Sequence, residues 1–79
     1  MHVGVRLYAG LGEAGSGATR GDPIALELEE GATVRTAIEA LGLPQERIHL
    51  IFVNGTARRL DHPLANGDRV GLFPPVGGG

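Results

Sequence analysis

Every second residue is apolar in two stretches near the start of the chain, residues 2–8 and 24–29. The apolar positions are Val3, Val5, Leu7, Ile24, Leu26 and Leu28. A period of two is typical of a strand with one buried face, so the pattern predicts two strands. The glycine-rich segment between them, residues 10–21, is predicted to be a flexible loop, and the strands are predicted to pair as a wide hairpin.

The period changes after Gly31. Apolar residues then fall at i, i+3, i+4 and i+7, which indicates an amphipathic helix of about three turns. These residues are Val34, Ala37, Ile38 and Leu41. Thr33 is a credible N-cap, Gly42 is a typical helix terminator, and Pro44 prevents the helix from resuming.

Two further strands are predicted in the second half of the chain. Residues 49–53 are almost continuously apolar, as expected for a strand in the middle of a sheet, and Asn54-Gly55 is a strong turn signal. An irregular segment follows, and a second turn at residues 66–68 precedes the last strand, residues 69–73.

This order of elements predicts an α+β protein with a β-grasp (ubiquitin-like) fold, in which one helix packs across one face of a mixed sheet. A chain of 79 residues has room for one domain, with residues 1–73 as the globular body and residues 74–79 as an extended, flexible tail. The predicted core is Val3, Val5, Leu7, Ile24, Leu26, Leu28, Val34, Ala37, Ile38, Leu41, Leu50, Phe52, Leu60, Leu64, Val70 and Leu72.

The amino-acid composition argues against several classes of function. The sequence has no cysteine, and His2, His49 and His62 lack the spacing of metal ligands, so neither a metal site nor a bound cofactor is expected. A net charge of -2 with scattered arginines argues against nucleic-acid binding. Without a signal segment or an apolar run of membrane length, the protein is expected to be cytoplasmic.

The end of the sequence is chemically distinctive. After Val76 it consists of Gly77, Gly78 and Gly79, a thread without side chains that can enter a narrow channel and present a terminal carboxylate. Pro74 and Pro75 precede it and favour an extended, stiff base.

Taken together, several segments resemble the MoaD/ThiS sulfur carriers over the whole chain, and the ending resembles the MoaD branch most. These segments are Arg6-Leu7-Tyr8-Ala9-Gly10, Gly31-Ala32-Thr33-Val34, Val53-Asn54-Gly55, Asn66-Gly67-Asp68-Arg69-Val70 and Leu72-Phe73-Pro74-Pro75-Val76-Gly77-Gly78-Gly79. The resemblance implies that an E1-like adenylyltransferase uses ATP to activate the Gly79 carboxylate, and that a sulfur donor converts it to a thiocarboxylate. In the MoaD branch the large subunit of molybdopterin synthase would then receive the sulfur, and the carrier would not be catalytic alone.

The same resemblance suggests where partners bind. Tyr8 and Phe73 are expected on the solvent face of neighbouring strands, beside Pro74 and Pro75, where they would form an apolar docking patch. Val76 and Gly77 would continue the contact along the tail, and Gly78 with Gly79 would enter the partner's active site.

Three other functions remain open from the sequence. The chain could be a ubiquitin-like modifier that is joined to other proteins through Gly79, or a sulfur carrier for thiazole or another sulfur metabolite. It could also be a non-covalent β-grasp binding module whose tail has no chemical role.

Overall fold

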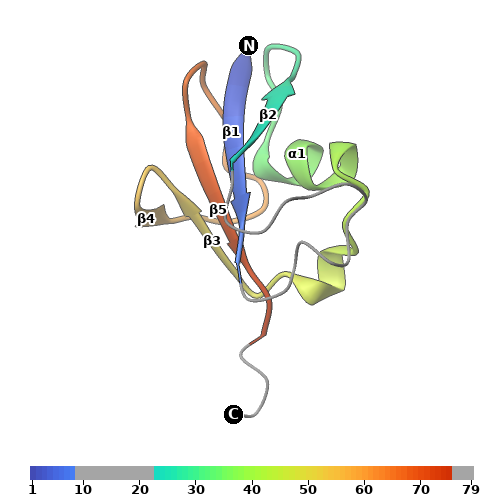
Figure 1. The fold of residues 1–79 in the computed structure, drawn as a ribbon. Coiled ribbons are helices and arrows are strands. Elements are labelled where there is room, and N and C mark those ends of the chain that lie inside the picture. Colours follow the sequence, from blue (N-terminus) through green and yellow to red (C-terminus); the bar gives the residue numbers. More distant parts are fainter. Residues whose placement is uncertain (9–22, 76–79) are drawn as a thin grey trace.

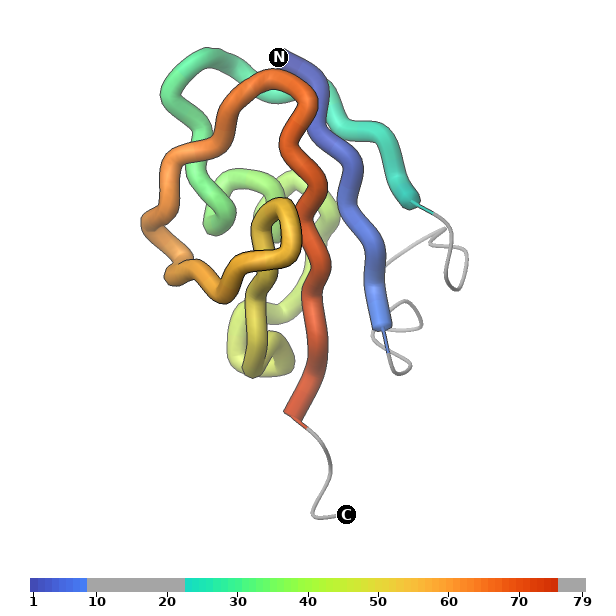
Figure 2. The backbone as a smooth tube through the Cα atoms, turned by 90° about the vertical axis from the view of Figure 1, so that its left-hand side faces the viewer, coloured from blue at the N-terminus to red at the C-terminus, as the bar shows by residue number. Residues whose placement is uncertain are grey.

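The computed structural model describes residues 1–8 and 23–75, and within them five strands form one mixed sheet. The strands are β1 (His2–Leu7), β2 (Ile24–Glu27), β3 (Leu50–Val53), β4 (Thr56–Ala57) and β5 (Arg69–Phe73), in the order β2-β1-β5-β3-β4. β1 pairs antiparallel with β2, as the hairpin prediction required, and parallel with β5. The central strand is therefore the last one in the chain (Figures 1 and 2).

One helix, α1 (Val34–Ala40), lies on one face of this sheet (Figure 1). Its start confirms the predicted N-cap: the Thr33 hydroxyl accepts from the Thr36 backbone N–H, and the Thr36 hydroxyl accepts from Thr33. Gly42 ends the helix with a positive φ of 71°, a conformation that costs glycine nothing. The helix is shorter than predicted, and the 3-10 turn η2 (Gln45–Arg47) follows it. No helix in the described residues is long and apolar enough to cross a membrane.

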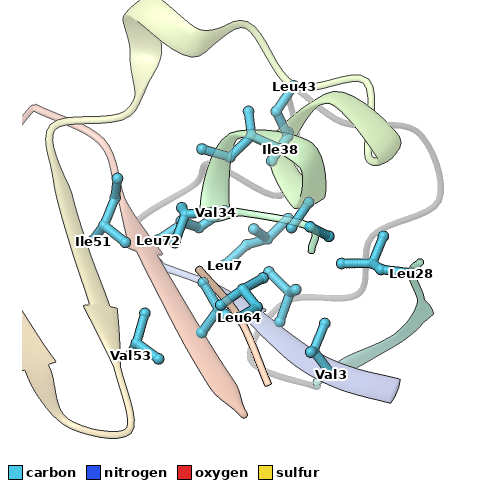
Figure 3. Packing of buried hydrophobic residues seen from close by; sticks show 14 residues of the cluster. Val3, Leu7, Leu28, Val34, Ile38, Leu43, Ile51, Val53, Leu64 and Leu72 are labelled. Carbon is cyan, nitrogen blue, oxygen red and sulfur yellow. The ribbon is translucent and has the colours of Figure 1, made fainter. Parts of the chain in front are cut away.

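The core lies between α1 and the sheet (Figure 3). Its buried members are Val3, Val5, Leu7, Leu28, Ala32, Val34, Ala37, Ile38, Leu43, Ile51, Val53, Leu64, Val70 and Leu72. Ile24, Leu26, Leu41 and Leu60 are only partly buried but pack against this cluster, so they belong to the predicted core at its margin.

The predicted core was wrong in β3. Leu50 and Phe52 were assigned to the core, whereas the structure buries Ile51 and Val53 and leaves Leu50 41% exposed. β3 is apolar on both faces, so its own sequence carries no alternation that fixes which face turns inward. The register with β5 decides it, because Ile51 pairs with Leu72 and Val53 pairs with Val70, both of which are core residues.

This correction can be tested by a pair of truncations. We expect Ile51→Ala to lower the free energy of unfolding by about 2–5 kcal/mol, as for other buried aliphatic residues. We expect Leu50→Ala to lower it by about 0.5 kcal/mol, because its side chain already meets solvent. Urea denaturation followed by circular dichroism measures both values, and a larger loss for Leu50→Ala would reverse the assigned faces.

A side-chain network joins the turn after β3 to the turn before β5. The Asp68 carboxylate accepts from the Ala65 N–H at 2.8 Å and from the Asn54 side-chain amide at 2.9 Å, and these bonds lower the pKa of Asp68. Asn54 also accepts from the Arg69 N–H at 3.0 Å through its Oδ1. These bonds fix the start of β5 against the end of β3. They therefore help to set the position of β5, the strand that leads to Pro75.

Candidate functional site

The face of the sheet opposite α1 carries the predicted docking patch. None of the described helices covers this face (Figure 1), and the strand registers place Tyr8, Phe52 and Phe73 on it. A shallow depression of about 420 Å³ runs across the face, with Tyr8, Phe52, Phe73, Arg6, Arg69 and Asn54 among its lining residues.

The aromatic side chains of this face form one cluster. The rings of Tyr8 and Phe73 stack with centroids 4.3 Å apart and an interplanar angle of 2°. Phe52 meets Phe73 edge to face, with centroids 5.5 Å apart and an angle of 82°. Such contacts hold each ring in one orientation, so the cluster is a preformed apolar surface.

Gly71 makes room for this stack. It lies on β5 on the same face, opposite Phe52 on β3. A Cβ at this position would come 3.3 Å from Cε2 of Tyr8 and 3.7 Å from Cε1 of Phe73. A larger side chain would therefore push Tyr8 aside, which explains why the strand carries a glycine here.

Backbone hydrogen bonds hold β5 in the sheet up to its last residue, Phe73. The Tyr8 N–H donates to the Leu72 carbonyl at 3.1 Å, and the His49 N–H donates to the Phe73 carbonyl at 2.7 Å. Pro74 and Pro75 have no N–H to continue the ladder. Since β5 is the central strand, the chain leaves the sheet from its best-supported element, at the end of the molecule opposite the N-terminus (Figure 2).

The predicted site residues are only partly placed by the structure. Tyr8 and Phe73 lie on adjacent strands and are half-buried against each other, as expected for a patch. Pro75 is exposed, as a member of the patch should be. Pro74 is buried, so the prediction that it belongs to the exposed patch was wrong. Val76, Gly77, Gly78 and Gly79 lie outside the described residues, as does the predicted loop at residues 10–21.

Sequence reasoning missed two members of the apolar surface, Leu50 and Phe52. Both were assigned to the core, and they lie beside Phe73 and Gly71 on the opposite face. The signal that could have found them is the register of β3 against β5, because Phe73 was already placed outward. Among residues 1–8 and 23–75, no group of three or more His, Asp and Glu side chains is arranged to hold a metal ion.

The arrangement is therefore an ordered aromatic patch beside the point where a glycine-ended segment leaves the central strand. Residues 18–79 match the profile of the ThiS family. This chain belongs to the ThiS family. The match includes β2, α1, β3 and β5, and it runs to Gly79. It confirms the family resemblance that the segments of the sequence indicated.

Individual relatives of this ThiS-family chain agree with that assignment. The molybdopterin synthase sulfur carrier subunit of Escherichia coli (strain K12) is 50% identical over 40 residues, which are 51% of this chain and 48% of that protein. The chain thus matches about half the length of this curated relative.

Solved structures of similar proteins share the fold. The H. volcanii small archaeal modifier protein 1 superposes with a TM-score of 0.74 at 27% identity, covering 95% of this chain and 98% of that one. The putative molybdopterin converting factor subunit 1 of Pyrococcus furiosus gives a TM-score of 0.72 at 29% identity, covering 96% and 99%. These similarities confirm the predicted β-grasp fold for the ThiS-family chain.

Proposed function

We propose that this protein is a sulfur carrier for molybdopterin synthesis and that the α-carboxylate of Gly79 carries the sulfur. The observation that carries the proposal is the ThiS-family match over residues 18–79, which includes the whole glycine ending. The identity to a molybdopterin synthase sulfur carrier subunit favours the molybdopterin pathway over thiazole or another sulfur metabolite.

The chemistry needs two steps because a carboxylate is a poor electrophile. In the first, a carboxylate oxygen of Gly79 attacks the α-phosphorus of ATP, a P–O bond forms, and pyrophosphate leaves. In the second, sulfide from a sulfur donor attacks the acyl carbon, the bond to AMP breaks, and the thiocarboxylate remains. ATP and the sulfur donor act through an E1-like adenylyltransferase, so the carrier supplies no catalytic side chain of its own.

The described residues explain how such a carrier would be recognised. The cluster of Tyr8, Phe52 and Phe73 would dock on the adenylyltransferase, and later on the large subunit of molybdopterin synthase. Docking next to the end of β5 lets the residues after Pro75 reach the partner's active site from a fixed starting point.

An intact-mass measurement tests the proposal. After incubation with the cognate adenylyltransferase, ATP and sulfide, the protein should gain the mass that exchanging one oxygen for one sulfur adds. Tandem fragmentation should place that gain on Gly79, and omission of ATP should prevent it. A protein that never gains this mass under conditions where the enzyme consumes ATP would refute the proposal.

A second function is favoured by one specific comparison, the similarity to the small archaeal modifier protein 1. In that role Gly79 would form an amide bond with a lysine of another protein. Covalent conjugates in extracts of the native organism, lost when Gly78 and Gly79 are removed, would support it. The two functions share the activated carboxylate, so conjugates would add to carrier activity and would not exclude it.

A further inference from the structure

The open face of the sheet also has a basic half, formed by Arg6 and Arg69 beside the aromatic cluster. Arg6 lies level with Phe52, across Gly71, and Arg69 lies farther from the end of β5. Arg6 on β1 pairs with Gly71 on β5, and Arg69 on β5 pairs with Gly4 on β1. Both arginines are exposed and line the same depression as the aromatic rings. A Cβ built on Gly4 would meet no atom of the described residues within 4 Å. Among the described residues, both arginine side chains are therefore accessible from this face.

The described residues leave these two charges without a carboxylate. In residues 1–8 and 23–75 the only contact within 4.0 Å between a basic and an acidic side chain joins His2 to Glu27, at 3.9 Å, on the far side of β1 from β5. The nearby Asp68 carboxylate accepts hydrogen bonds from the Ala65 N–H and the Asn54 amide, and it lies more than 4.0 Å from the guanidinium nitrogens of both arginines. Within the described residues, this face thus carries two arginines that no carboxylate contacts, although the net charge of the protein is -2.

We propose that this basic half binds carboxylates on the adenylyltransferase. The docking face would then recognise the enzyme through charge pairs as well as through apolar contacts. The inference rests on the proposed function. Two arginines beside an aromatic cluster suit an apolar protein surface with an acidic rim, whereas a polyphosphate chain would demand a longer run of cations than this acidic protein offers.

Charged residues at this position suit a carrier that must associate with the enzyme and dissociate from it repeatedly. The carrier has to meet the enzyme often and leave it after activation, so fast association is more useful than slow dissociation. Opposite charges at the rim of an interface raise the association rate and change the dissociation rate less. They also make association sensitive to ionic strength.

The test compares association rates of charge-reversed variants with the cognate adenylyltransferase at low and high salt by stopped-flow fluorescence. We expect Arg6→Glu with Arg69→Glu to slow association roughly tenfold or more at low ionic strength, and much less at high ionic strength. The neutral pair Arg6→Gln with Arg69→Gln should give an intermediate rate.

Arg58→Glu with Arg59→Glu is the matched control. It makes the same change in net charge, but these exposed arginines line a different depression, with Asp61, His62 and Pro63. It should slow association much less than the reversal of Arg6 and Arg69 does, and the difference should be clearest at an ionic strength of about 0.15 M, where charges more than about 8 Å from the interface are largely screened. Circular dichroism of each variant checks that the fold is intact.

The outcomes separate this inference from the function itself. If the wild-type chain gains the thiocarboxylate and both double reversals slow association equally, the basic half is not a recognition site and only this inference fails. If the wild-type chain neither binds the enzyme nor gains sulfur, the proposed function fails as well. Saturable binding of single-stranded RNA, lost on reversing Arg6 and Arg69, would overturn the assignment to a protein partner.

Discussion

Removal of Gly78 and Gly79 is expected to abolish thiocarboxylate formation completely. In the proposed function the reacting group is the terminal carboxylate, and a chain that ends two residues early would place its carboxylate short of the partner's active site by up to about 7 Å. One phenylalanine appended after Gly79 should have the same effect, because a side chain at the end blocks entry into a narrow channel. Intact mass after incubation with adenylyltransferase, ATP and sulfide measures both.

The sharpest control for this experiment changes no residue. A semi-synthetic chain that ends in the Gly79 amide should gain no sulfur, whereas the same semi-synthetic chain with a free carboxylate should gain it fully. Both chains keep the body of the protein, so binding to the enzyme should survive in each. Sulfur on the amidated chain would show that the reacting group is somewhere else.

Truncation of Phe73 is expected to give the second largest effect. This ring stacks on Tyr8 and meets Phe52 edge to face, so Phe73→Ala removes both of the aromatic contacts that hold the cluster together. Central aromatic residues of an interface typically contribute about 2 kcal/mol or more to binding, so we expect the Kd for the adenylyltransferase to rise roughly thirtyfold. Isothermal titration calorimetry with the enzyme in the absence of ATP measures the Kd directly.

Two further variants separate docking from stability. Tyr8→Phe keeps the stacked ring and should change the Kd by less than about threefold, because only the hydroxyl is lost. Leu41→Ala truncates a partly buried residue at the end of α1, on the other layer of the protein, and should lower stability without changing the Kd. An unchanged Kd for Phe73→Ala, with the fold intact, would remove the aromatic cluster from the docking surface.

Local signals in the sequence were sufficient where the structure is decided locally. The start of α1 depends on Thr33 and its bonds with Thr36, and its end depends on Gly42, all within a few residues of the helix. The alternation in β1 was clear because only one of its faces is apolar. These positions matched the structure for the same physical reason: each preference acts through neighbours in the chain.

The candidate site was predictable only in outline. Placing Tyr8 and Phe73 on one face required the parallel pairing of β1 with β5, which the β-grasp arrangement implied. The stacking distance of 4.3 Å, the role of Gly71 as the space beside Tyr8, and the burial of Pro74 could not be derived, because each depends on atoms distant in sequence. The neighbouring position of Arg6 and Arg69 likewise follows from register alone.

The sequence by itself determined the class of fold, the N-cap of the helix, the glycine that follows its end, and a glycine ending that suits a carried acyl group. Tertiary structure alone decided which face of β3 turns inward and therefore which side chains form the proposed docking surface. The reason lies in the two-residue period of a strand: when both faces are apolar, either phase buries similar area. Only pairing with β5, where Leu72 and Val70 already point into the core, selects Ile51 and Val53 for the interior and leaves Leu50 and Phe52 outside.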